Sequence, residues 1–342
     1  MKIFDLEYYI SSFFRRVRVR FRKAVRRREI SGPLFLRYLS VLVISYNLFF
    51  VARPLKKIEP AVGGDVLSES IQDLKSKDVA PVRIEGTDEP NEFLAKAALI
   101  MDATSSAVLF EKNKDFRLPP ASLTKMMTAL LTLENKKLTE EIIVSQNCTE
   151  VDGLKIGFKA GQRYSVENML YALLLPSASD AACVLSENVF PEASASAQFI
   201  VRMNQRAKDL GLSDTNFTNP TGLDGPNGDH YSTAADLLSL TREVLKNEDF
   251  RKVVSTRQKK IGSLSGQETF LLKTTNELLL ENNGFSGVKT GSTPKALGCL
   301  SFLFERDGHQ IIGVILGSDD RFKDAKNLVN WVLESYRWPP SN

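Results

Sequence analysis

The order of strand-like and helix-like segments between residues 93 and 338 most constrains the fold. Two apolar runs flank residues 102–106 near the start of this region, which is typical of a β-hairpin. Further strand-like runs stand near its end, with a turn at Asp307–Gly308, and the segments between have helical periodicity. This order predicts an α+β domain, in which both chain ends build one antiparallel sheet flanked by helices, with an inserted helical subdomain.

The middle of this region is predicted to contain several helices separated by breaks. A helix begins around Ser122, and Pro176 interrupts a second apolar stretch, so that a new helix follows from about Asp180. A long helix ends at Gly211. Ser177 therefore stands at a junction between two helices.

The start of the chain combines a basic segment with an apolar one. Ten basic and three acidic residues give residues 1–32 a net charge of +7, and since the whole chain carries +4, the remainder carries −3. Residues 33–52 form a run of about 20 residues, long enough to cross a bilayer as a helix, with Arg37 as the single charge. Because the basic residues precede this run, we predict one transmembrane helix with a cytoplasmic N-terminus and an extracytoplasmic body.

Two alternative roles for the basic segment stay open. Residues 6–28 would also suit an amphipathic helix on a membrane surface, and the basic cluster alone would suit a nucleic-acid-binding arm. Membrane orientation with attraction to anionic lipid accounts for the basic and apolar segments together. The long basic region and the absence of a small-x-small cleavage site favour an uncleaved anchor over a signal peptide. Since the body is not basic, we expect no nucleic-acid partner.

These observations divide the chain into four parts. Residues 1–32 are predicted to be a cytoplasmic basic segment, residues 33–52 an anchor and residues 53–92 a polar linker with little fixed structure. Residues 93–338 are predicted to form the globular domain.

Cysteine and histidine limit the available chemistry. Cys148, Cys183 and Cys299 do not have the spacing of metal ligands, so we expect no metal site. One disulfide is compatible with this number, but we favour three partly buried thiols that pack as small apolar groups. His230 and His309 are the only histidines, which leaves little from which to build a Ser-His-Asp triad.

Ser122 and Lys125 offer a different nucleophile and base. They lie three residues apart at the start of an apolar helical stretch, so they share one helix face. A serine hydroxyl needs a base, and lysine serves when burial lowers its pKa enough to make it neutral. The helix N-terminus also favours negative charge near Ser122. The S-x-x-K pattern alone is common, and it usually consists of a capping serine beside a snorkelling lysine.

Two further stretches change that assessment. Lys289-Thr290-Gly291 lies on a late strand, and Ser177 opens an S-x-N-like triad. S-x-x-K, S-x-N and K-T-G in this order are the signature of penicillin-recognising serine acyl transferases. From about residue 95 to 338 the chain resembles low-molecular-mass penicillin-binding proteins that act as serine D-Ala-D-Ala carboxypeptidases, with further similarity in residues 219–240, 274–279, 287–293 and 313–331. The resemblance implies a β-lactamase/transpeptidase-like fold for residues 93–338.

The resemblance also implies catalytic roles. Ser122 would be the nucleophile that forms an acyl-enzyme with the penultimate D-Ala and releases the terminal one, and Lys125 would take its proton. Ser177 would relay a proton to the leaving amine, and Lys289 would maintain the electrostatic field of the site. Water would then hydrolyse the acyl-enzyme. No metal or cofactor would take part.

The residues implied in substrate binding are Ser179, Thr290, Gly291, Ser292 and Arg321. Thr290 and Arg321 would bind the terminal carboxylate of the substrate, because a guanidinium matches a carboxylate geometrically. The backbone N–H groups of Ser122 and Ser292 would form the oxyanion hole.

The chain departs from the family pattern in two places. The S-x-N triad usually ends in Asn, whereas Ser179 stands here, and a hydroxyl reaches less far than an amide. This difference bears on activity and substrate preference. Family members often carry a C-terminal all-β domain and an amphipathic anchor, whereas this chain ends at Asn342, so we expect the N-terminal span to replace that anchor.

The resemblance thus implies a serine D-Ala-D-Ala carboxypeptidase held in a bacterial cell membrane by residues 33–52. Its substrates would be peptidoglycan stem peptides, and β-lactams would inhibit it covalently. A D,D-endopeptidase acting on cross-links and a non-catalytic, membrane-tethered wall-binding protein stay open as alternatives. A class A β-lactamase needs a glutamate in an E-x-x-L-N-type loop between Ser177 and Lys289, where this chain has "NPTGLDG" instead.

Overall fold

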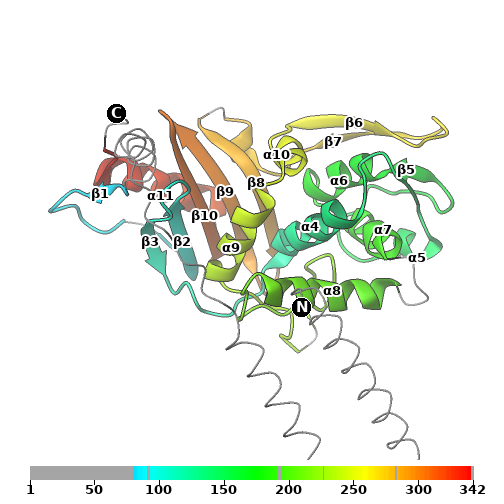
Figure 1. Cartoon of the computed structure of the whole chain (residues 1–342), viewed down its shortest axis with the longest axis horizontal. Helices are drawn as coiled ribbons and strands as arrows, with labels where there is room; N and C mark the ends of the chain where they lie inside the picture. The colour runs from blue at the N-terminus through cyan, green and yellow to red at the C-terminus, as the bar shows by residue number, and fades with distance from the viewer. Residues whose placement is uncertain (1–79, 91–92, 191–194, 226, 282, 340–342) are drawn as a thin grey trace, which may run out of the picture. The chain divides into compact units, whose positions relative to one another are not determined.

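The computed structural model describes residues 80–90, 93–190, 195–225, 227–281 and 283–339. A five-stranded antiparallel sheet in the order β3-β2-β10-β9-β8 forms the centre of this part of the chain (Figure 1). Its strands are β2 (Ala97–Asp102), β3 (Val108–Lys112), β8 (Phe285–Thr293), β9 (Leu297–Arg306) and β10 (His309–Ser318). Early β2 pairs directly with late β10, so both ends of the domain build one sheet, and the predicted α+β class is confirmed.

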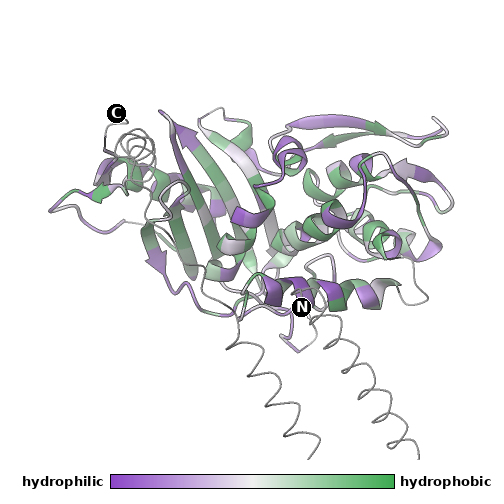
Figure 2. Ribbon diagram, in the orientation of Figure 1, coloured by the Kyte–Doolittle hydropathy of each residue, from purple (hydrophilic) through white to green (hydrophobic). Residues whose placement is uncertain are grey.

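Side chains alternate between the two faces of the sheet, and both faces are buried. Along β9, Cys299 and Leu303 pack into the core on one face, whereas Leu300, Phe302 and Phe304 pack into the core on the other. This double burial explains why the late strands read as nearly continuous apolar runs. Figure 2 shows the hydrophobic residues along these central strands.

Helices cover each face. Helix α11 (Arg321–Ser335) packs on one face through its apolar stripe, which includes Leu328 and Val332. The opposite face carries α9 (Ala234–Val244) and α10 (Glu248–Val254), and α4 (Lys125–Asn135) joins them to the helical region (Figure 1). That region contains α5 (Gln146–Thr149), α6 (Val166–Leu174), α7 (Ser179–Val189) and α8 (Ala195–Asp209).

Several short elements were not expected from the sequence. Two small two-stranded sheets pair β4 (Glu141–Ile143) with β5 (Arg163–Ser165) and β6 (Gln258–Gly262) with β7 (Thr269–Lys273). The strand β1 (Val82–Arg83) pairs with β11 (Tyr336–Arg337), although the linker prediction gave these early residues little fixed structure. Strands of two to five residues carry too short a pattern to be recognised alone.

The preference for three free thiols was wrong. Cys148 and Cys183 form a disulfide between α5 and α7, with a Cα–Cα distance of 5.4 Å, while Cys299 is a free, buried thiol. The two partners stand 35 residues apart in the chain, so only the fold brings them together.

Among the described residues, no helix is both long enough and apolar enough to cross a membrane. The predicted span at residues 33–52 lies outside the described residues, as does the predicted basic segment at residues 1–32.

Candidate active site

Ser122 lies in a tight turn directly before α4. The turn is the 3-10 helix η1 (Ala121–Thr124), in which Ala121 has a positive φ of 47°, and the α-helix begins only at Lys125. The sequence predicted a helix already at Ser122. The turn matters because it leaves the serine hydroxyl half-buried at the edge of a cavity, while Lys125 is packed inside.

Lys125 contacts the hydroxyl of Ser122 directly. Its Nζ donates to Ser122 Oγ at 3.0 Å and to the carbonyl oxygen of Thr221 at 2.6 Å. The side chain is 1% exposed, and this burial lowers the pKa of Lys125 to about 7, while the carboxylate of Asp180 opposes the shift. An amine with this pKa is substantially neutral near pH 7 and is able to accept the proton of the serine.

Ser177 and Lys289 form a second serine–lysine pair. Ser177 occupies the junction before α7 with a positive φ of 65°, and its Oγ accepts from Lys289 Nζ at 2.9 Å. Lys289 is also 1% exposed and donates to the carbonyl oxygen of Thr290 at 2.8 Å. Burial first, then the charges of Lys125 and Arg321, lower the pKa of Lys289. An anionic ligand near these cations would favour the protonated form of Lys289.

Two glycines let neighbouring segments approach the nucleophile. A Cβ on Gly291 of β8 would lie 2.7 Å from the backbone nitrogen of Ser122. A Cβ on Gly222 would lie only 2.0 Å from the carbonyl oxygen of Ala121. No larger residue fits at either position without displacing the turn that holds Ser122. Ser122 and Ser292 consequently belong to two adjoining segments of backbone.

Thr290 and Arg321 line the same cavity as Lys125. The hydroxyls of Thr290 and Thr275 lie 2.5 Å apart, and Arg321 Nη1 donates to the carbonyl oxygen of Gly291 at 3.0 Å. Burial lowers the pKa of the Arg321 guanidinium, and its Nε is buried without a hydrogen-bond partner among the described residues. A carboxylate would compensate this desolvated cation.

The S-x-S triad borders a loop that lines part of the cavity. Ser179 begins α7 and is 3% exposed, and its N–H donates to the carbonyl oxygen of Leu154 at 2.7 Å. Asp180 follows it and accepts the N–H groups of Ile156 and Gly157, each at 2.9 Å, through Oδ2. This loop therefore rests on the first turn of the helix that follows Ser177.

These groups enclose one cavity of about 210 Å³. Of the nine predicted site residues, eight line it, namely Ser122, Lys125, Ser177, Ser179, Thr290, Gly291, Ser292 and Arg321. Lys289 lies behind the wall and contacts the cavity through Ser177. The arrangement places a serine hydroxyl against a buried lysine of lowered pKa, beside a second serine–lysine pair and a desolvated guanidinium. These groups together suit acyl transfer from a substrate with a free carboxylate.

Sequence reasoning missed several residues of this site. Thr221 contributes only a backbone carbonyl, and Asn219 Oδ1 holds the turn around it by accepting the N–H groups of Thr221 and Gly222. Gly153 and Leu154 line the cavity as well. Side-chain chemistry does not reveal backbone acceptors, although the segment from residue 219 belonged to the recognised pattern.

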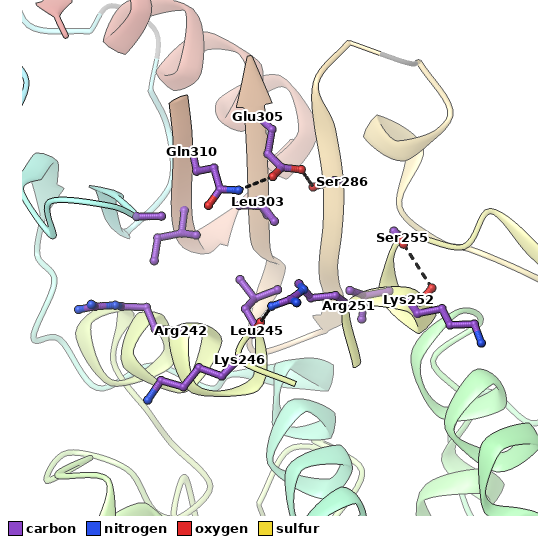
Figure 3. Close-up of a pocket in the computed structure, with 13 residues that line it drawn as sticks. Arg242, Leu245, Lys246, Arg251, Lys252, Ser255, Ser286, Leu303, Glu305 and Gln310 are labelled. Atoms are coloured by element: carbon purple, nitrogen blue, oxygen red, sulfur yellow. Dashed lines mark hydrogen bonds between the residues drawn. The ribbon is translucent and has the colours of Figure 1, made fainter. Parts of the chain in front are cut away.

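A larger cavity of about 770 Å³ lies between the sheet and the helices α9 and α10 (Figure 3). It contains none of the nine predicted site residues. The ammonium groups of Lys246 and Lys252 on its rim point to opposite sides, and Lys246 forms an ion pair with Glu243. The smaller cavity, where Ser122 and Lys125 meet, is therefore the candidate active site.

The chain resembles known proteins in sequence and in structure. The model of the D-alanyl-D-alanine carboxypeptidase family matches residues 84–320. D-alanyl-D-alanine carboxypeptidase DacF of Bacillus subtilis is 31% identical over 254 residues, which cover 72% of this chain and 64% of that protein. A D-alanyl-D-alanine endopeptidase of Pseudomonas aeruginosa is 30% identical over 249 residues, covering 70% and 78%. The crystal structure of the Streptomyces K15 DD-transpeptidase superposes with a TM-score of 0.68 at 32% identity, covering 72% of this chain and all of that one.

Proposed function

Because this chain belongs to the D-alanyl-D-alanine carboxypeptidase family, whose members are serine-type hydrolases, we propose that it removes the terminal D-Ala from peptidoglycan stem peptides. Ser122 Oγ attacks the carbonyl carbon of the penultimate D-Ala while its proton passes to Lys125. The C–N bond to the terminal D-Ala then breaks, and its nitrogen receives a proton through Ser177. Water hydrolyses the resulting acyl-enzyme and regenerates Ser122.

One observation carries this proposal: the 3.0 Å hydrogen bond from Lys125 Nζ to Ser122 Oγ. Its significance comes from burial, because a lysine in water would be protonated and unable to act as a base. In this site desolvation lowers the pKa of Lys125 to about 7, so the neutral amine is available at physiological pH.

The remaining residues suit a substrate that ends in a carboxylate. Arg321 and Thr290 bind that carboxylate. Its negative charge favours the protonated form of the buried Lys289, whose pKa burial otherwise lowers. The N–H groups of Ser122 and Ser292 stabilise the oxyanion of the tetrahedral intermediate, which is worth about 3 kcal/mol per donor. Ser179 stands where the family usually has an amide, and its hydroxyl offers one donor and two acceptor sites to a substrate.

D-alanine release tests the proposal. The purified full-length chain is incubated with an N-acylated peptide that ends in D-Ala-D-Ala, beside its Ser122→Ala variant. Release from the parent protein and none from the variant supports the carboxypeptidase. A folded parent protein that releases no D-alanine and is not acylated by labelled penicillin would contradict the proposal and favour the non-catalytic wall-binding alternative.

Endopeptidase activity is the second candidate. The Pseudomonas aeruginosa relative is named a D-alanyl-D-alanine endopeptidase, and cleavage of a cross-link is the same acyl transfer with a different leaving amine. Purified cross-linked muropeptide dimers discriminate the two. A Ser122-dependent conversion of dimers to monomers that outpaces D-alanine release would favour the endopeptidase.

We also propose that residues 33–52 anchor the chain in a bacterial cell membrane, with the catalytic domain outside. The apolar run and the ten basic residues before it support this topology. Anchoring would hold the site beside newly made wall material. Fractionation of cells that express the full chain, followed by protease treatment of spheroplasts, tests it: the chain should remain with membranes, and the catalytic domain should be digested from outside.

A further inference from the structure

The loop of residues 150–162 forms part of the cavity wall. It runs from the end of α5 to the start of β5 and places Gly153 and Leu154 beside Ser179. Leu154 is 53% exposed, so the loop gains little from burial of its own side chains at this point. The far end of the loop is anchored by Phe158, which is buried against Tyr164 and Phe270. The end that lines the cavity is positioned by bonds between its backbone and α7.

The bonds between the loop and α7 are concentrated on the first turn of that helix. The N–H of Ser179 and the carboxylate of Asp180 together bind the loop backbone at Leu154, Ile156 and Gly157. The same turn of α7 follows Ser177 directly. A shift of this turn would therefore move both the loop and the Ser177 hydroxyl.

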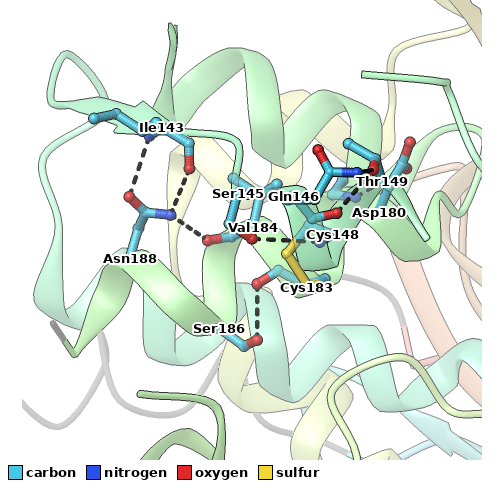
Figure 4. Close-up of a disulfide and its surroundings, with 11 residues drawn as sticks. Ile143, Ser145, Gln146, Cys148, Thr149, Asp180, Cys183, Val184, Ser186 and Asn188 are labelled. Atoms are coloured by element: carbon cyan, nitrogen blue, oxygen red, sulfur yellow. Dashed lines mark hydrogen bonds between the residues drawn. A yellow bond between two sulfur atoms is a disulfide. The ribbon is translucent and has the colours of Figure 1, made fainter. Parts of the chain in front are cut away.

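The disulfide fastens the start of the loop to this helix. Cys148 lies in α5, two residues before the loop begins, and its sulfur is bonded to that of Cys183 in α7 (Figure 4). Ser179 and Cys183 are four residues apart, so they lie on one face of α7. The covalent link and the hydrogen bonds therefore act on the same two segments, and loss of the link would leave α5 and the loop held by non-covalent contacts alone.

We propose that Cys148 and Cys183 are positioning residues for the active site, and that acylation of Ser122 depends on the redox state of this pair. The inference rests on the proposed function, since it concerns the same nucleophile. With the disulfide formed, the loop stays against Ser179 and the cavity keeps its shape. With the disulfide reduced, the loop wall moves, and the substrate is held less well for attack by Ser122.

The chemistry of the switch is an exchange with a dithiol reductant. One thiolate of the reductant attacks a sulfur of the pair, and the second thiol resolves the mixed disulfide. Two cysteine thiols and the cyclic disulfide of the reductant are the products, so electrons and protons balance. Cys183 is half-buried and Cys148 fully buried, so Cys183 is the more accessible sulfur.

Cys299 does not belong to this switch. It is buried beside the carbonyl oxygens of Pro119 and Ala296, and burial raises the pKa of its thiol to about 11. Little thiolate forms at neutral pH, so the thiol is a poor nucleophile for exchange. Its variant is therefore a suitable control for effects of reductant that do not involve the disulfide.

The test compares the oxidised full-length chain with the same protein after treatment with dithiothreitol. Labelled penicillin reports the rate of acylation, and D-alanine release is analysed for kcat and KM separately. Because small misplacements in an active site cost up to about 100-fold in rate, we expect acylation to fall at least about 10-fold on reduction. Reoxidation should restore it, Cys299→Ala should respond as the parent does, and Cys148→Ser/Cys183→Ser should be slow and insensitive to dithiothreitol.

Two further measurements separate positioning from general stability. Hydrogen exchange should accelerate at the amides of Ile156 and Gly157 on reduction but not in α9, and the reduced protein should melt above the assay temperature. The proposal is overturned if reduced protein, with free Cys148 and Cys183 shown by alkylation, acylates at the parent rate, or if it loses activity only by unfolding globally. If even the oxidised protein shows no Ser122-dependent acylation, the proposed function itself has failed.

Discussion

The Nζ of Lys289 donates a hydrogen bond of 2.9 Å to the Oγ of Ser177, which joins the central sheet to the junction before α7. The two residues are 112 positions apart, so this contact depends on the docking of the helical region against β8. Because the Ser177 oxygen accepts this bond, the proton of the same hydroxyl is available for donation to another group.

Replacing Ser177 with Ala should therefore impair turnover more than folding. The change removes one hydroxyl from a half-buried position, but it removes the proton relay to the leaving amine as well. Since proton transfer by a positioned group contributes about 10²–10⁴-fold, we expect kcat for D-alanine release to fall within that range. Steady-state assays beside thermal melting check this, and an unchanged kcat in a folded variant would contradict a relay role.

Lys125→Met should nearly abolish acylation. Methionine approximates the volume of the buried side chain but cannot accept the Ser122 proton, so the loss should reach about 10²–10⁴-fold. Lys208→Met on the exposed surface of α8 is the matched control and should acylate normally. Stopped-flow acylation by a chromogenic β-lactam measures both variants, and an active Lys125→Met would require another base.

Acylation should also depend on pH through Lys125. Its neutral form is the base and its pKa is about 7, so kcat/KM should rise with pH up to about 7 and then level off. Below that value protonation removes the base, and the rate should fall about tenfold per pH unit. The Asp180 carboxylate raises this pKa, so Asp180→Asn should move the midpoint to lower pH. A profile that stays flat down to pH 5 would contradict the assignment.

Much of this site could be predicted from the sequence because several of its residues stand at a recognisable spacing within short segments. Ser122 and Lys125 are neighbours on one turn, and the strand of Lys289 is recognisable as a late apolar run. The antiparallel pairing of β2 with β10 also follows, since early and late strands around a helical middle have few other ways to share a sheet.

Other features depend on tertiary distances that no local pattern encodes. The carbonyl of Thr221 binds Lys125 across 96 positions of sequence, and any residue supplies such a carbonyl. Cys148 pairs with Cys183 because α5 packs against α7. The 3-10 turn at Ser122 packs closely against the backbone of Gly222, 100 positions later in the chain. The sequence of the turn alone does not reveal this contact.

That close approach makes Gly222 a sharp test of how the nucleophile is held. Gly222 has φ +85°, and a Cβ there would overlap the carbonyl oxygen of Ala121. Gly222→Ala should therefore displace the Ser122 turn, lowering stability by about 1–3 kcal/mol and acylation by at least about 10-fold. Gly211→Ala is the matched control, because Gly211 also has a positive φ of +74° but a Cβ there would have no neighbour within 4 Å. This variant should lose about 1 kcal/mol of folding stability and keep its activity. Chemical denaturation and acylation rates separate the two effects, and equal behaviour of both variants would mean that strain, not the contact with Ala121, determines the outcome.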